Sequence, residues 1–339
     1  MKLCWHYFRL LFDDFTLTLV AVVALASLLP AHGAGAVWFG HLTTAAIALL
    51  FFMHGAKLSR QAIWDGLTHW RLHTLVFAFT FLAFPLIALI CKPLLEPLLG
   101  HELYIGMIFL CALPGTVQSA IAFTSLARGN VPAAVCSASA SSIIGILATP
   151  VLVALLVSIK ADQGIPLLES IVSISAELLL PFVVGHLARP LIGRFMDRNR
   201  PLLNKVDQGS ILLVVYTALS ESVVTGLWTS VSPQSLILLT LTCCVLLAIA
   251  LGATAWLGRR LRFNREDQIT IVFCASKKSM ATGVPMAQLL FTGALLGPAL
   301  LPLMIYHQIQ LMVCAVLAQR YAAHAVAREY ADQSTPESA

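Results

Sequence analysis

The stretch CASKKSMATG, from Cys274 to Gly283, places two adjacent lysines inside an apolar segment that runs from Ile269 to Leu290. At 1.5 Å per residue, Lys277 and Lys278 lie roughly 12–14 Å into that segment, near the middle of a bilayer. A charge at this depth costs on the order of 3 kcal/mol, so ionisable residues there are functional candidates. Adjacent residues point about 100° apart around a helix, which makes snorkelling to one helix end difficult for both. At least one lysine is therefore expected to face a polar interior.

The whole chain has the composition of a polytopic membrane protein. Of its 339 residues, 59% are hydrophobic and 11% are charged, and the mean hydropathy of +0.87 lies far above that of soluble domains. A membrane-spanning helix needs roughly 20 predominantly apolar residues. The sequence therefore predicts an all-α membrane protein with ten transmembrane helices near residues 15–31, 36–54, 74–91, 103–126, 132–157, 167–187, 208–228, 234–257, 269–291 and 295–318.

The net charge of +5 follows from membrane topology. In the ten-span arrangement, seventeen of the 21 Lys and Arg residues fall on one side of the membrane. Lys92 and Lys160 fall on the other side, while Lys277 and Lys278 lie within a span. The positive-inside rule then predicts a multi-pass protein of the cell (inner) membrane with both termini in the cytoplasm. The basic loops need no nucleic-acid partner.

The sequence carries no pattern that predicts an enzyme. Its eight cysteines form no C-x-x-C pair and no His/Cys ligand spacing, so neither a disulfide framework nor a zinc site is expected. It also lacks an H-E-x-x-H motif and a grouped nucleophile and base. We expect no cofactor other than a coupling ion such as sodium.

The ten spans divide into two sets of five. Residues 1–157 form the first predicted repeat, 158–166 a link, 167–318 the second repeat and 319–339 a cytoplasmic tail. Because five is odd, a duplicated five-span unit must lie inverted relative to its partner, as in many secondary transporters.

The fourth span of each half supports this duplication. LYIGMIFLCALPGTVQSA (residues 103–120) aligns with REDQITIVFCASKKSMATG (residues 265–283) when Cys111-Ala112 is matched to Cys274-Ala275. Pro114 and Gly115 should open the first helix, because proline removes a backbone donor and glycine lowers helix stability. A polar patch from Ser276 to Gly283 should interrupt the second. Interrupted helices at matching positions predict a transport site, whereas a single such break would favour a simple kink.

Other polar residues inside the spans are candidates for the same site. Glu177 and Glu221 are the available counter-charges, and one is expected to pair with a lysine unless a neighbouring hydroxyl stabilises it. His307 is equally compatible with a site and with a hydrogen-bonded core histidine. The serine row could line a path, although small residues favour close helix packing; it comprises Ser137, Ser139, Ser141 and Ser142.

Two motifs resemble a known family. LPGTVQSAIAFTSLARGNV (residues 113–131), followed by a serine-rich span ending in Thr149-Pro150, is similar to helices four and five of the bile acid:sodium symporter family. CASKKSMATGVPMAQLLF (residues 274–291) resembles a branch of bacterial sodium-dependent transporters related to member 7 of human solute carrier family 10. The resemblance implies a panel of helices one, two, six and seven, and a core in which discontinuous helices four and nine cross.

The resemblance also implies sodium-coupled transport of organic anions. Thr116, Gln118 and Ser119 occupy the helix-four motif that holds sodium, with Ser137 and Ser141 as further hydroxyl ligands. Helix nine departs from the family pattern, because it has no acidic residue and carries two lysines where polar sodium ligands are expected. An ammonium repels sodium at contact distance. The lysine is therefore either a tethered cation in place of the ion or a proton carrier.

The predicted function is a secondary active transporter of a small organic anion, coupled to sodium and/or protons by alternating access. A cation/proton antiporter and a regulatory membrane protein without transport are the alternatives. A substrate-sized cavity that reaches both helix breaks would separate transport from a structural role. The candidate substrate and ion site comprises Pro114, Gly115, Thr116, Gln118, Ser119, Ser137, Ser141, Glu177, Glu221, Ser276, Lys277, Lys278, Ser279, Thr282, His307 and Gln308.

Overall fold

The computed structural model describes residues 14–57, 69–157 and 167–334, and these ranges contain helices and no strands. The predicted link at 158–166 lies outside them. The first half contains α2 (Asp14–Leu28), α3 (Ala34–Lys57), α5 (Trp70–Ala78), the π-helical turn η1 (Phe79–Ala83), α6 (Phe84–Ile90), α7 (Lys92–Leu99), α8 (His101–Ala112), α9 (Gln118–Leu126) and α10 (Val131–Val157). The second half contains α11 (Leu167–Arg198), α12 (Arg200–Val224), α13 (Leu227–Ser230), α14 (Pro233–Arg260), α15 (Arg265–Ala275), α16 (Met280–Leu290), the 3-10 turn η2 (Gly293–Leu295) and α17 (Leu296–Ser334).

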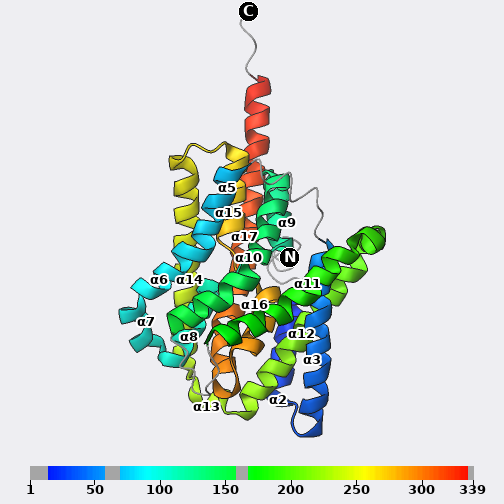
Figure 1. Cartoon of the computed structure of the whole chain (residues 1–339). Helices are drawn as coiled ribbons and strands as arrows, with labels where there is room; N and C mark the ends of the chain where they lie inside the picture. Colours follow the sequence, from blue (N-terminus) through cyan, green and yellow to red (C-terminus); the bar gives the residue numbers. More distant parts are fainter. Residues whose placement is uncertain (1–13, 58–68, 158–166, 335–339) are drawn as a thin grey trace, which may run out of the picture.

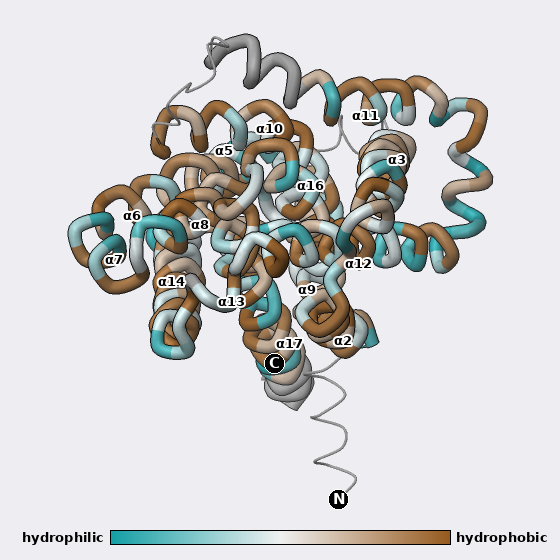
Figure 2. The backbone as a smooth tube through the Cα atoms, turned by 90° about the horizontal axis from the view of Figure 1, so that it is seen from below, coloured by the Kyte–Doolittle hydropathy of each residue, from teal (hydrophilic) through white to brown (hydrophobic). Residues whose placement is uncertain are grey.

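The helices confirm a multi-pass membrane protein. Within the described ranges, six helical stretches are long and apolar enough to cross a bilayer. Apolar residues predominate in these stretches, and the hydrophobic colour covers much of the tube in Figure 2. The last helix, α17, continues past the predicted end of its span at residue 318 and reaches Ser334. It projects beyond the other helices in Figure 1. The six stretches are Ala34–Lys57, Trp70–Ile90, Val131–Val157, Ala176–Arg198, Pro233–Arg260 and Gly293–His324.

Four helices gather on one side of the molecule, where α3 packs along α11 and α12 packs against α2 and α3 (Figure 1). Two glycines bring the backbones of α3 and α11 together. A Cβ on Gly55 would overlap the carbonyl of Phe182, and one on Gly185 would overlap that of Phe52. Small residues at a helix interface permit this close approach in a membrane, where lipid provides no hydrophobic drive for association.

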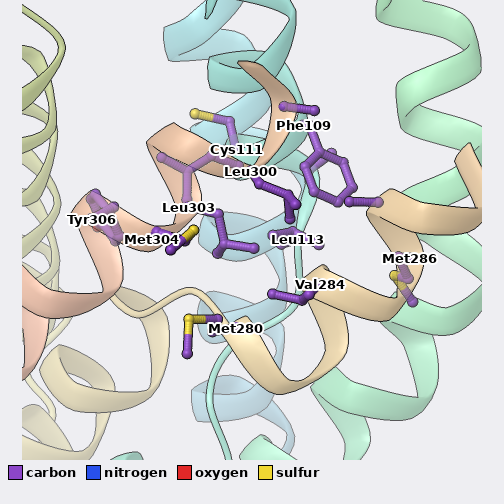
Figure 3. Packing of buried hydrophobic residues seen from close by; sticks show 14 of the residues in the cluster. Phe109, Cys111, Leu113, Met280, Val284, Met286, Leu300, Leu303, Met304 and Tyr306 are labelled. Carbon is purple, nitrogen blue, oxygen red and sulfur yellow. The ribbon is translucent and has the colours of Figure 1, made fainter. Parts of the chain in front are cut away.

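The remaining helices surround a buried apolar cluster. Figure 3 shows side chains of α8, of the break that follows it, of α16 and of α17 packing together, including Phe109, Leu113, Val284 and Leu303. Gly283 lies at the centre of this packing, because a Cβ there would approach Leu113 Cδ1 to 2.6 Å and Leu303 Cδ2 to 2.7 Å. The cluster fixes the short helix α16 against its neighbours.

The π-helical turn η1 lies just before Pro85 in the stretch Trp70–Ile90. The N–H of Phe84 donates to the carbonyl of Phe79, five residues back, and Pro85 has no N–H at all. The carbonyl of Thr80 therefore lacks a partner within its own helix. Turns of this kind are rare and occur frequently at functional sites.

Candidate functional site

Two interrupted helices meet in the interior of the protein, and the sequence predicts both interruptions. The first break separates α8 from α9 over residues 113–117, and the second separates α15 from α16 over residues 276–279. The breaks touch each other, since Ser279 N–H donates to Pro114 O at 2.9 Å. The backbones approach closely at Gly115, because a Cβ at this position would lie only 3.1 Å from Cys274 O.

Lys278 is completely buried at this crossing. Its ammonium donates three hydrogen bonds to backbone carbonyls, at 2.9 Å to Thr80 O, 2.7 Å to Cys111 O and 2.8 Å to Leu113 O. The same nitrogen lies 4.1 Å from the ring centroid of Phe84, a cation–π distance. An ammonium has three N–H donors, and all three are satisfied.

Gln310 of α17 fixes the backbone of Lys278. Its side-chain oxygen accepts from Lys278 N–H and its amide nitrogen donates to Lys278 O, both at 2.8 Å. Tyr306, one turn earlier, donates from its hydroxyl to Ser276 O at 2.8 Å. Two side chains of α17 thus satisfy backbone groups that the break in the preceding helix exposes.

Lys277 is equally buried but has fewer hydrogen bonds. Its ammonium donates to Ser119 O at 2.9 Å and lies 4.0 Å from the ring centroid of Phe123 and 5.3 Å from that of Phe273. The prediction of a polar interior is thus confirmed most clearly for Lys278. Neither ammonium reaches the surface of the protein.

The expected pairing of a lysine with Glu177 or Glu221 is wrong. Both carboxylates are exposed, and neither makes an ion pair among the described residues. Glu221 instead accepts from Gly293 N–H at 3.3 Å. Carbonyl dipoles and aromatic rings stabilise the lysines, so no carboxylate is needed next to them.

A cavity of about 160 Å³ reaches both helix breaks. Its wall includes Thr116, Gln118 and Ser119 at the start of α9, and the residues from Ser279 to Thr282 at the start of α16. Hydroxyl pairs lie at both places, with Ser119 Oγ 2.8 Å from Thr116 Oγ1 and Ser279 Oγ 3.1 Å from Thr282 Oγ1. His307 completes one side. The cavity brings together six of the predicted site residues.

The other predicted residues surround the cavity or lie apart from it. Pro114, Gly115, Ser141 and Ser276 are buried at the crossing, and Gly115 N–H donates to Ser141 Oγ at 3.1 Å. Ser137 Oγ lies 2.6 Å from His73 Nδ1, and Gln308 Oε1 accepts from Thr16 at 3.0 Å. These contacts support the crossing and the helix packing.

A second cavity of about 260 Å³ adjoins the first, because His54, Val117 and Gln118 line both. It extends toward Lys57 and Arg200 and includes two members of the serine row, Ser139 and Ser142. On the other side of the crossing, the helices are in close contact. Gln288 Nε2 donates to Val214 O at 3.4 Å, and a Cβ on Gly297 would lie 2.8 Å from Ser222 Cβ.

Asp207 is a central residue of the cavity that the sequence analysis missed. Its side chain is 5% exposed, and its Oδ2 pairs with Lys57 and accepts from Gln118 Nε2 at 3.3 Å. The other oxygen, Oδ1, is buried and has no hydrogen-bond partner in the described part of the chain. The predicted start of this span at residue 208 excluded Asp207, whereas α12 begins at Arg200.

The polar residues of α12 carried a signal for this site. Asn204 and Asp207 are three residues apart and therefore lie on one helix face, and Gln118 Nε2 contacts both, at 3.3 Å in each case. A face of this kind just inside a span predicts a wet or polar environment.

Comparison with known proteins defines the family. The profile of the SBF-like CPA transporter family matches residues 13–323. The chain belongs to this family. It is therefore a membrane transporter related to the bile acid:sodium symporters, as the motifs around Pro114 and Lys278 indicated.

Several relatives are similar along nearly their whole length. Protein PA2026 of Pseudomonas aeruginosa, named as uncharacterised, is 60% identical over 93% of this chain and 94% of its own length. YfeH of Escherichia coli K12, named provisionally as a symporter, is 56% identical over 93% of this chain and 94% of its own length. A zebrafish protein, sodium/bile acid cotransporter 7, is 28% identical over 89% of this chain and 91% of its own length.

Proposed function

We propose that this protein is a secondary active transporter that carries a small organic anion by alternating access at the helix crossing, coupled to sodium and/or protons. The observation that supports this most directly is one cavity in contact with the N-termini of both α9 and α16. Helix N-termini carry partial positive charge and unpaired N–H groups, which favour an anionic group. A regulatory protein without transport would not need this cavity.

The helix arrangement supports a two-domain transport cycle built from inverted repeats. α2, α3, α11 and α12 would form the panel, and the helices around the crossing would form the core. Gln118 of the core contacts Asp207 of the panel, so this hydrogen bond must break or shift when the two bodies move. The adjoining cavities extend toward the basic residues Lys57 and Arg200. With the positive-inside orientation, this arrangement corresponds to a state open toward the cytoplasm.

The oxygen atoms around the cavity fit a sodium ion. Hard cations prefer oxygen ligands, and the cavity wall supplies the hydroxyls of Thr116 and Ser119 and the amide of Gln118. The buried Oδ1 of Asp207, which lacks a partner among the described residues, is a further oxygen of the same wall. Bound sodium would contribute a positive charge next to the anion, and these four residues would hold it.

Ligand-induced stabilisation tests this proposal, because a ligand stabilises the state it binds. Purified protein would be screened against small organic anions by thermal shift, with and without sodium and from about pH 5.5 to 8.5. Ala281→Phe, which fills the cavity, should abolish the shift. Ala248→Phe, on the exposed face of α14, should leave it unchanged. Equal shifts in both variants would contradict binding at the crossing.

Thiol labelling tests the proposed orientation of the protein in the membrane. Cysteines introduced beside Arg198 and Arg262 should be protected from an impermeant thiol reagent in whole cells, and a cysteine beside Lys92 should be labelled. The reverse pattern would invert the proposed topology.

Asp207 favours one second candidate, a cation/proton antiporter, because such exchange needs a buried carboxylate. Proteoliposomes with an imposed pH gradient and no organic anion distinguish the two. Sodium movement that Asp207→Asn abolishes would support antiport. Dependence on an added organic anion would support symport.

A further inference from the structure

The three carbonyls around Lys278 have the arrangement of a cation site. Thr80 O, Cys111 O and Leu113 O come from two different spans and converge on one nitrogen at 2.7–2.9 Å. Rings of backbone carbonyls bind dehydrated monovalent cations in channel filters by the same ion–dipole interaction. We call these three carbonyls the carbonyl cage.

Each carbonyl of the cage lacks a backbone donor for an identifiable reason. Thr80 O has no helical donor, because Phe84 N–H donates to Phe79 O and Pro85 has no N–H. The helical partner of Cys111 O would be Gly115 N–H, which donates to Ser141 Oγ instead. Leu113 has extended backbone geometry in the break, with φ −70° and ψ 152°.

The adjacent carbonyls of the break have donors of their own. Ala112 O accepts from the Thr149 hydroxyl at 2.9 Å, and Pro114 O accepts from Ser279 N–H at 2.9 Å. Only the cage carbonyls among these depend on a charged donor. Three converging carbonyl oxygens without donors would repel one another, so a cation at their centre is required for this backbone to be stable.

Backbone carbonyl dipoles compensate the positive charge of Lys278. Lys278 makes no ion pair among the described residues, and its nitrogen lies at the C-terminal end of α8, where the helix dipole is negative. The face of Phe84 covers the nitrogen at 4.1 Å. These are the partners that a small bound cation would have.

We propose that the Lys278 ammonium is a built-in replacement for a dissociable monovalent cation, and that the carbonyl cage becomes a binding site for small primary ammonium ions when this side chain is shortened. The proposal does not depend on which compound the protein transports. It implies that this position keeps its positive charge through the whole transport cycle without sodium.

Chemical rescue tests the proposal. Lys278→Ala removes three carbons and the ammonium, which are the atoms of propylammonium. We expect the variant to have a lower Tm than wild type, and propylammonium to raise this Tm progressively with the logarithm of its concentration. Wild-type protein should not respond, because its cage is filled. 1-Propanol has the same chain and no charge, so it should have little effect.

Lys277→Ala is the matched control. Its removed ammonium had one carbonyl partner, Ser119 O, so its response to propylammonium should be smaller than that of Lys278→Ala. Tetramethylammonium, which has no N–H donor, should rescue neither variant. Equal rescue by propanol and propylammonium would mean that only volume matters, and this would overturn the proposal. A Lys278→Ala protein with wild-type Tm and no response would do the same.

A second pair of variants covers the case in which Lys278→Ala does not fold. Lys278→Gln and Lys277→Gln retain much of the side-chain length and two N–H donors without charge. The cage predicts a clearly larger loss of Tm for Lys278→Gln, since three carbonyls lose an ammonium there. A larger loss for Lys277→Gln would refute the cage as the site that requires the charge.

Discussion

Replacing Gln310 with methionine should weaken the helix crossing strongly, because it removes both hydrogen bonds to the backbone of Lys278. Gln310 is fully buried and the two bonds measure 2.8 Å each. Each buried backbone group left unsatisfied costs about 1–3 kcal/mol. His307 Nδ1 lies 3.4 Å from Lys278 O and can compensate for part of one loss. We therefore expect a loss of about 3 kcal/mol, a factor of roughly 150 in the unfolding equilibrium.

The matched control is Gln308→Met on the same helix. Gln308 is half-buried, accepts one hydrogen bond from Thr16 at 3.0 Å, and its Nε2 has no partner in the described part of the chain. Its replacement should cost at most about 1 kcal/mol. Reversible unfolding in mixed detergent micelles, followed by tryptophan fluorescence, would measure both. Losses that agree within about 0.5 kcal/mol would refute the role of Gln310, since additive errors are of that size.

Three further predictions concern helix packing, a hydrogen bond in the second break and an ion pair of α7. Gly185→Leu should destabilise the α3–α11 contact severely, whereas Gly209→Leu, with open space around it, should change the Tm little. Tyr306→Phe should cost about 1–3 kcal/mol, because a buried carbonyl in the second break loses its donor. The His101 hydrogen bond lowers the pKa of Glu96, so this contact stabilises the protein above the ordinary glutamate pKa of about 4.3 and loses its effect as the pH falls through the lower folded-state value. The Tm values of wild type and Glu96→Gln should therefore converge in acid, and a difference that is constant with pH would contradict this.

The sequence was sufficient for the all-helical, multi-pass class and for the two helix interruptions. Apolar length predicts spans directly, and Pro114 and the polar patch after Ala275 each break a helix by local chemistry. The burial of Lys277 and Lys278 was predicted from their depth within an apolar segment. These features depend on residues that are close together in the chain.

The sequence was insufficient where distant segments supply the partners. The donors and acceptors of Lys278 are backbone atoms, which have no distinguishing letter in the sequence, so a carboxylate partner was expected instead. Asp207 was missed because its helix begins earlier than its apolar segment. The α3–α11 contact likewise depends on two glycines, Gly55 and Gly185, that are compatible with many other arrangements.

The carbonyl cage has a consequence for how the protein is made. Leu113 and Lys278 are 165 residues apart, which at roughly 5–20 residues per second corresponds to about 10–30 s of synthesis. During that interval the helices up to α10 enter the membrane with Thr80, Cys111 and Leu113 carbonyls that have no cation. Water or the insertion machinery must solvate them until the segment with Lys278 arrives, because lipid cannot. We therefore expect the first half of the chain to be an incomplete membrane protein that depends on the second half for this positive charge, and we expect a nascent chain that stalls before Lys278 to be a substrate for membrane quality control.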